Sequence, residues 1–313
     1  MMYKRIAFSI ALLLPALIFA NFVNAIGARQ SQDRSTWKWQ RSDDGMKLEV
    51  KVEGKVVFAE DYSDVRDIPD NGALRIMDER TAVRKLYVVT RGADGQLRRS
   101  YSVNGETRAF DAGAREWLRG VLLLAARQGG VDARARVRRI LQRGGTQALI
   151  EEISHIEGDY ARRIYFEELL KVEGLDTGAL TNALRDASKK ISSDYERAQL
   201  LLHVADRYLV KSELLPVYFA AADQIGSDYE HRRVLSAALK KSKLGPEALL
   251  KMLKSSSVIK SDYEKATFLI EAAQLFVGET GLRSAFLEVV ETITSEYERG
   301  RVLSSLAKKN ILN

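Results

Sequence analysis

The chain of 313 residues contains no cysteine, which removes several kinds of chemistry at once. Without a thiol, no disulfide can hold the fold together, even in an oxidising compartment. Thiol nucleophiles and metal sites built on soft sulfur ligands are excluded for the same reason. The fold must therefore be maintained without covalent cross-links.

Histidine is almost as scarce, and the familiar catalytic motifs are missing. The three histidines, His155, His203 and His231, stand alone, and none lies in the HExxH context that places two metal ligands on one helical face. The sequence also lacks a G-x-S-x-G elbow, a P-loop and a G-x-G-x-x-G dinucleotide turn. We therefore assign no catalytic residues, no metal ligands and no cofactor, although a triad assembled from distant residues would leave no such pattern.

Only the N-terminus is apolar enough to suggest contact with a membrane or an export machinery. A basic start, an apolar stretch over residues 6–20 and a small-residue site at Val23-Asn24-Ala25 are typical of a signal peptide. We expect residues 1–25 to be cleaved and residues 26–35 to be a linker, so that the protein is periplasmic or secreted and bacterial. An uncleaved anchor is the alternative, although the apolar run is short for a span of about 20 residues.

The C-terminal half, by contrast, is organised by five copies of one short motif, spaced 34 or 35 residues apart. The copies begin at Ile156, Ile191, Ile225, Ile259 and Ile293, and the last four read I-x-S-[DE]-Y-E. A fixed period of this length is typical of a solenoid of helix–turn–helix units, none of which can bury its apolar face alone. The sequence therefore predicts about five such repeats over residues 150–313.

Each later copy of the motif contains the residues of a capping box. Its serine can accept a hydrogen bond from the N–H three positions on, while the glutamate can reach back to the serine's own N–H. The isoleucine and the tyrosine are predicted to be core and joint residues between repeats, so that Tyr229→Ala would cost about 3 kcal/mol. The repeat residues assigned in this way are Ser193, Tyr195, Glu196, Ser227, Tyr229, Glu230, Ser261, Tyr263, Glu264, Ser295, Tyr297 and Glu298.

Residues 36–111 have a different composition, rich in β-branched and aromatic residues and interrupted by Asp-Gly and Asn-Gly turns. Apolar and charged residues alternate over residues 46–52, which is typical of a strand with one buried face. We expect six or seven antiparallel strands in a meander or small sandwich. Trp37 and Trp39 share one side of the first strand and are interpreted as sheet-covering aromatics, with a binding platform as the alternative. The predicted fold class is α+β, a β-rich domain followed by an α-solenoid.

Residues 112–149 connect the two regions and concentrate positive charge. Two helices are expected here, each ended by a Gly-Gly pair. Eight arginines oppose only two acids, whereas the rest of the chain is close to neutral. Arg134, Arg138 and Arg139 share one side of the second helix and are the candidate contacts to an anionic group such as phosphate, carboxylate or a lipid head. The alternative is a solvated face partly neutralised by acids such as Glu152.

The I-x-S-D-Y-E-[RK] repeats resemble those of poorly characterised exported bacterial proteins. Similar repeats accompany some antirepressor-type membrane metallopeptidases of the β-lactamase-sensor kind. The resemblance covers about residues 112–313, but this sequence lacks the multispan membrane region and the HExxH motif of such peptidases, so their activity is not implied. The unit length is also similar to that of tetratricopeptide repeats, whose W-x-x-L-G-x-x-Y signature is absent, and a HEAT-like or tetratricopeptide-like array is the expectation.

These features favour a non-enzymatic exported interaction or scaffold protein, whose helical-repeat surface binds a protein or peptide partner in the cell envelope. Two alternatives stay open. One is a hydrolase, or a hydrolase-accessory protein, with a site where the β-rich domain meets the repeats. The other is an envelope sensor that binds an anionic lipid or glycan. The export signal argues against nucleic acid, any membrane contact is expected to be peripheral, and the sequence does not determine the oligomeric state.

Overall fold

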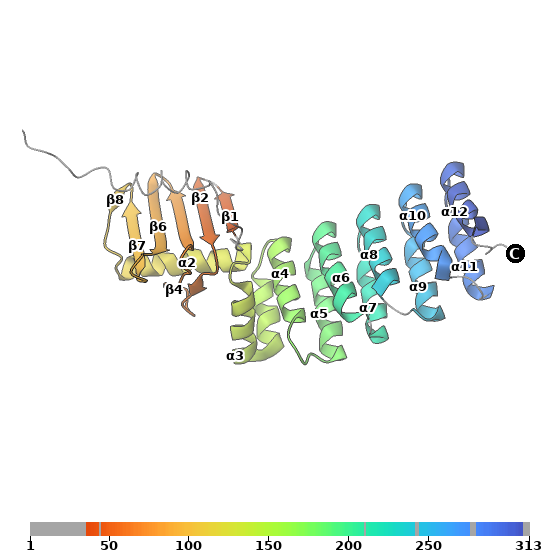
Figure 1. The fold of residues 1–313 in the computed structure, drawn as a ribbon, viewed down its shortest axis with the longest axis horizontal. Helices are drawn as coiled ribbons and strands as arrows, with labels where there is room; N and C mark the ends of the chain where they lie inside the picture. The colour runs from red at the N-terminus through yellow and green to blue at the C-terminus, as the bar shows by residue number, and fades with distance from the viewer. Residues whose placement is uncertain (1–35, 44, 210, 242–243, 276–279, 309–313) are drawn as a thin grey trace, which may run out of the picture. The chain divides into compact units, whose positions relative to one another are not determined.

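The computed structural model describes residues 36–308 except 44, 210, 242–243 and 276–279 (Figure 1). The predicted signal peptide and linker lie outside the described residues. The chain divides into two compact units. The β-rich unit comprises the chain up to Val57 together with Arg66–Arg108, and the helical unit comprises Phe58–Val65 together with the chain from Ala109 onward.

The β-rich unit contains a six-stranded antiparallel meander in the order β1-β2-β5-β6-β7-β8. Its strands are β1 (Thr36–Asp43), β2 (Met46–Glu53), β5 (Ala73–Arg80), β6 (Val83–Arg91), β7 (Leu97–Val103) and β8 (Glu106–Thr107). Two more short strands, β3 (Val57–Phe58) and β4 (Val65–Asp67), pair in a ladder of their own. The described residues thus form eight strands rather than six or seven, because the segment between β2 and β5 turns back on itself.

One face of the sheet is buried, as the alternation of apolar and charged residues predicts. Leu48 and Val50 of β2 are fully buried, as are Ile76 of β5 and Tyr87 of β6. The register places Val50 opposite Ile76 and Ile76 opposite Tyr87, so these side chains share one face. Trp39 lies opposite Val50 in β1 and is partly buried, which puts its indole on the same face.

The helical unit is a succession of helices separated by short connections. They are α2 (Ala112–Gly129), α3 (Ala133–Ser154), α4 (Asp159–Leu170), α5 (Thr177–Lys190), α6 (Asp194–Tyr208), η1 (Ser212–Leu214), α7 (Leu215–Ala222), α8 (Asp228–Lys241), α9 (Pro246–Ser257), α10 (Asp262–Ala272), η2 (Ala273–Leu275), α11 (Thr280–Glu291) and α12 (Glu296–Lys308). The coarse prediction, an α+β protein in which an antiparallel sheet precedes the helices, is confirmed.

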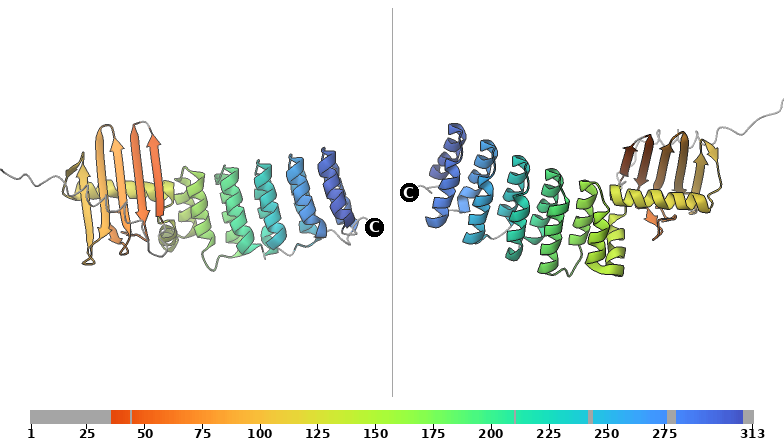
Figure 2. Two further views of the ribbon diagram at one scale, coloured as in Figure 1. Left: turned by 45° about the horizontal axis from the view of Figure 1, so that its top comes forward. Right: turned by 180° about the vertical axis from the view of Figure 1, so that it is seen from behind.

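From α4 onward the helices lie in two rows, which Figure 2 shows from two further sides. The even row consists of α4, α6, α8, α10 and α12, and each member contacts the next. The odd row consists of α5, α7, α9 and α11, which contact one another in the same way. A single apolar cluster runs through the unit from Ala133 to Leu306, so every pair of helices buries its apolar side against its neighbours.

The two Gly-Gly pairs of the connecting helices each end a helix. Gly130 adopts the left-handed conformation, with φ of 75°, and its N–H bonds to the carbonyl of Ala126, so it ends α2 as predicted. Gly145, with φ of 65° and ψ of −166°, is non-helical and divides α3 into two helices. The second connecting helix therefore ends at the Gly144-Gly145 pair as predicted, and another helical stretch continues directly to Ser154.

Candidate functional site

The isoleucine and the tyrosine of the repeat motif have different surroundings. The isoleucines Ile156, Ile191, Ile225, Ile259 and Ile293 are all buried, as predicted. The tyrosines are exposed: Tyr160 by 48%, Tyr195 by 54%, Tyr229 by 52%, Tyr263 by 57% and Tyr297 by 75%. The prediction that the tyrosines are buried core and joint residues is therefore wrong.

The geometry of the even-row helices explains the exposed tyrosines. Each tyrosine is the second residue of its helix. In α6 the buried residues that follow Tyr195 at offsets of 3, 6, 9 and 10 are Ala198, Leu201, Val204 and Ala205. At about 100° per residue, their mean direction lies about 110° from the tyrosine around the helix. The tyrosine therefore stands outside the buried stripe, in a position that the offsets already implied.

The serine of the motif caps its helix as predicted. Its hydroxyl accepts a hydrogen bond from the N–H three residues on, at 3.3–3.4 Å, in the pairs Ser193–Glu196, Ser227–Glu230, Ser261–Glu264 and Ser295–Glu298. The first copy has Gly158 in place of serine and no side-chain cap. The serine half of the capping box is therefore present in the four later copies.

The other half of the capping box is replaced by a contact between repeats. The serine N–H donates to the aspartate of the preceding copy, in the pairs Ser193–Asp159 at 2.6 Å and Ser227–Asp194, Ser261–Asp228 and Ser295–Asp262 at 2.8 Å. The glutamate that was expected to receive this N–H pairs instead with an arginine, as Glu196 does with Arg163 of the preceding repeat at 2.5 Å. The first-turn acid therefore joins successive repeats as well as facing its own helix dipole.

The exposed tyrosines form a row, which we call the tyrosine row: Tyr160, Tyr195, Tyr229, Tyr263 and Tyr297. Guanidinium groups lie over three of the rings, Arg163 over Tyr160 at 5.3 Å, Arg232 over Tyr229 at 5.3 Å and Arg301 over Tyr263 at 5.6 Å from the ring centroid. Each of these arginines is also bonded to a glutamate. The even row thus presents one exposed aromatic ring per repeat, bordered by ion pairs.

Most of the arginines of the connecting helices are bonded within the helical unit. Arg127 and Arg136 both pair with Glu152. Burial alone would raise the pKa of Glu152, but the hydrogen bonds from these two arginines lower it below its ordinary value. Arg139 donates to Asp132 at 2.9 Å and to the hydroxyl of buried Tyr62 at 3.0 Å. The expected neutralisation by Glu152 is therefore present, and Arg139 is directed away from an external partner. The remaining ion pairs of this group are Arg115–Asp64, Arg119–Glu116 and Arg143–Glu60.

Arg134 and Arg138 differ from the other six, since neither forms an ion pair with any described residue. Both are exposed and line a cavity of about 590 Å³ that we call the arginine pocket. Its other cations, Lys171 and Arg207, come from the end of α4 and the last turn of α6. The complete lining is Arg134, Arg138, Leu141, Gln142, Glu168, Lys171, Val172, Glu173 and Arg207.

The sequence marks Arg134 and Arg138 as candidate contacts, but not the other two cations of the pocket. Lys171 and Arg207 are far from Arg138 in sequence, and each lies in an ordinary amphipathic helix with no distinguishing motif. Only the stacking of α3, α4 and α6 brings them to one cavity. No local signal could have found them.

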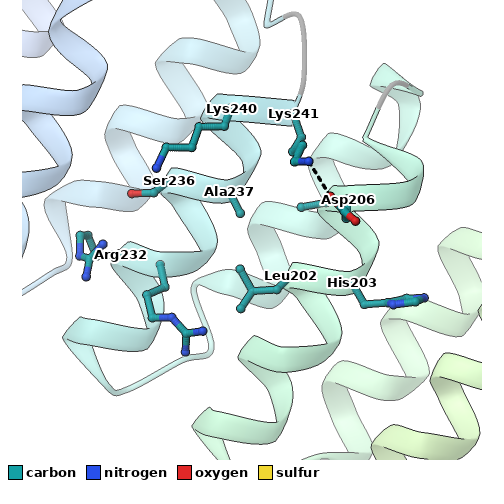
Figure 3. A pocket seen from close by; sticks show the side chains of 10 residues that line it. Leu202, His203, Asp206, Arg232, Ser236, Ala237, Lys240 and Lys241 are labelled. Carbon is teal, nitrogen blue, oxygen red and sulfur yellow. Dashed lines mark ion pairs between the residues drawn. The ribbon is translucent and has the colours of Figure 1, made fainter. Parts of the chain in front are cut away.

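A second cavity, of about 440 Å³, lies between α6 and α8 and is shown in Figure 3. We call it the α6–α8 pocket. Its cations all have carboxylate partners: Lys241 with Asp206 at 2.6 Å, Arg232 with Glu264, Arg233 with Glu230, and Lys240 with Glu271 at 3.9 Å. Burial lowers the pKa of His203 in this cavity, which favours the neutral imidazole. Its charge is therefore largely balanced from within the protein.

A serine, a histidine and an aspartate meet between the even and the odd row, but without the geometry of a catalytic triad. His231 Nε2 lies 2.9 Å from Ser255 Oγ, and the Ser255 hydroxyl donates to Asp223. The carboxylate is 3.7 Å from the same Nε2, whereas a triad places the acid on the other ring nitrogen. His231 and Ser255 are also buried, so a substrate could not reach them. This cluster therefore joins α8, α9 and the end of α7.

The described residues contain no group of three or more histidine, aspartate or glutamate side chains that could hold a metal ion.

None of the helices within the described residues is both long and apolar enough to cross a bilayer. Comparison of the chain with protein-family models, with curated proteins and with solved structures gives no match.

Proposed function

We propose that this is a non-enzymatic interaction protein whose helical-repeat surface binds a protein or peptide partner. In this proposal α4–α12 form a short solenoid of about five repeats, similar to HEAT or tetratricopeptide arrays and to the repeats of some exported bacterial proteins. The N-terminal sequence supports export, so the partner would lie in the cell envelope. The observation that carries the proposal is the tyrosine row.

The tyrosine row has the character of a binding surface for two reasons. A single exposed aromatic residue is common on protein surfaces. Five exposed tyrosines at the same position of successive repeats require an explanation. Tyrosine is also enriched at protein–protein interfaces, because its ring provides a large contact area with little loss of conformational freedom. Arginines that flank the rings are the other residue type favoured there.

The spacing of the row favours a partner segment that lies across the helices. Packed helices are about 8–10 Å apart, so consecutive rings repeat at about this distance. An extended polypeptide advances about 3.3 Å per residue, so about every third residue of such a segment would meet a tyrosine. One partner segment could therefore contact several repeats in register.

The test is photocrosslinking from the row itself. A photoreactive amino acid at Tyr195 or Tyr229 should join the protein to one partner in cell-envelope preparations. The triple variant Y195S/Y229S/Y263S, pulled down with the same preparation, should lose that partner. The matched control is L250S/V258S, which changes two exposed apolar residues at α9 in the odd row and should keep it. Equal recovery by both variants would reject the proposal.

A further inference from the structure

The arginine pocket and the α6–α8 pocket differ in how their positive charge is balanced. Every lysine and arginine of the α6–α8 pocket has a carboxylate partner. In the arginine pocket, Arg134, Arg138 and Arg207 form no ion pair with any described residue, and only Lys171 has one, with Glu168 at 2.6 Å. Three guanidinium groups therefore line one cavity without an ion pair to any residue that the structure describes.

Like charges around one cavity repel each other, and the lining does not neutralise them. Its four cations and two carboxylates, Glu168 and Glu173, leave a formal charge of +2. Arg207 is stabilised in part by its place in the last turn of α6 and by the ring of Tyr208, whose centroid lies 5.8 Å from the guanidinium carbon. Neither contact removes its charge, so a bound dianion would relieve the repulsion.

We propose that the arginine pocket binds a phosphate monoester. Such a group carries a charge between about −1.5 and −2 at neutral pH, which matches the charge of the lining. Guanidinium groups present N–H donors in a planar fork that fits phosphate oxygens, and three of them can share the oxygens of one phosphate. The volume of about 590 Å³ also lies within the range of small-ligand sites.

The rest of the lining suits the organic part of such a ligand. Leu141 and Val172 provide apolar contact, while Gln142 and Glu173 can exchange hydrogen bonds with hydroxyl groups. Arg139 is not part of the site, because Asp132 and Tyr62 already hold its guanidinium. This proposal does not depend on the tyrosine row, so either can fail alone.

The first experiment is calorimetric titration of the purified protein with inorganic phosphate, at constant ionic strength adjusted with chloride. The double variant R134Q/R138Q and the single variant R207Q should each lose about tenfold or more in affinity, because each removes charge-assisted hydrogen bonds. The matched control is R115Q/R119Q, which also removes two exposed arginines four residues apart and should bind phosphate as the unaltered protein does. Circular dichroism of each variant checks that it is folded.

The pH dependence separates phosphate recognition from general attraction of anions. The second pKa of a phosphate monoester is about 6, and that of inorganic phosphate is higher, close to neutrality. Affinity for inorganic phosphate should therefore decline as the pH falls below neutrality. Sulfate stays doubly charged over this range and should show no such decline. Equal losses of affinity in R134Q/R138Q and R115Q/R119Q would overturn the proposal. Undetectable binding of inorganic phosphate by the unaltered protein would also overturn it, unless a lipid with the same head group binds.

The source of the phosphate monoester is decided by vesicle binding. Vesicles of phosphatidylcholine with phosphatidic acid expose the monoester on a membrane, whereas inorganic phosphate is free in solution. Sedimentation with these vesicles that is lost in R134Q/R138Q and R207Q assigns the site to a lipid head group. Binding of phosphate without sedimentation assigns it to a soluble ligand. Failure of both, or sedimentation that the variants do not alter, would show that the pocket is only a solvated basic surface.

Discussion

The β-rich unit and the repeats of the helical unit both depend on periodicity, but they use it differently. In the sheet, a period of two separates a buried from an exposed face, and the strands are joined by backbone hydrogen bonds in a simple meander. In the repeats, a period of 34 or 35 residues reproduces one polar contact, in which the serine N–H donates to the aspartate carboxylate of the preceding copy. Single polar residues should therefore matter more in the repeats than in the sheet.

The largest loss of stability is expected when a buried isoleucine is replaced by alanine. This loss should be equal in the two units, because it depends on burial alone. Ile76 of the sheet and Ile191 of the repeats are both fully buried. Replacing either by alanine removes buried methyl groups and leaves a cavity, at a cost of about 3 kcal/mol. Hydrogen exchange measured by mass spectrometry should locate the lost protection in the β-rich unit for Ile76→Ala and in the helical unit for Ile191→Ala. A cost well below 2 kcal/mol at either site would show that its neighbours collapse into the space.

The contact between repeats should be the next most sensitive feature. The carboxylate of Asp194 accepts the Ser227 N–H at 2.8 Å, and a hydrogen bond to a charged group is worth about 1.5–3 kcal/mol. We expect Asp194→Ala to lower the free energy of unfolding by about 2 kcal/mol in urea titrations. The comparison variant is Glu106→Ala, which removes an exposed ion pair with Arg108 in the sheet and should cost less than about 0.5 kcal/mol. Similar losses would contradict the contrast between the units.

Helix capping should have an intermediate effect. Ser193→Ala removes the hydroxyl that accepts from the Glu196 N–H and should cost about 1 kcal/mol. The neighbouring Ser192 is exposed and uses only its backbone N–H, so Ser192→Ala should change stability little. Thermal melting of the two variants side by side tests whether the cap, rather than serine content, stabilises the repeat.

The contact between repeats should also introduce a dependence on pH. Hydrogen bonds from the side chain of Thr294 and the backbone of Ser295 lower the pKa of Asp262 below its ordinary value. A carboxyl group with a lowered folded-state pKa stabilises the protein above its unfolded value of about 4, and this contribution is lost as the pH falls through the folded value. Urea midpoints measured between about pH 5 and pH 3 should therefore fall less in Asp262→Asn than in the unaltered protein.

The smallest effect on stability is expected in the tyrosine row. Tyr195 is more than half exposed, so Tyr195→Ala should change the free energy of unfolding by less than about 0.5–1 kcal/mol. The same variant should weaken partner capture if the row is a binding surface. If Tyr195→Ala instead lowers the free energy of unfolding by about 3 kcal/mol, Tyr195 is a joint between repeats, as the sequence first suggested.

Local pattern determined much of this fold. The alternation of apolar residues predicted the buried face of the sheet, and the spacing of the motif predicted the buried isoleucines and the serine caps. These features depend on residues within a few positions of each other, where one period specifies which side of an element is covered. The Gly144-Gly145 pair likewise marked the end of the second connecting helix, since Gly145 is non-helical.

Tertiary structure decided the features that require residues from different repeats. The sequence placed Asp194 in a first turn but could not show that it reaches Ser227, because that contact depends on how α6 and α8 stack. Arg134 and Arg138 were visible as charges, yet only the packing of α3, α4 and α6 placed Lys171 and Arg207 beside them. The physical reason is that burial follows local periodicity, whereas convergence of charge depends on three-dimensional distance.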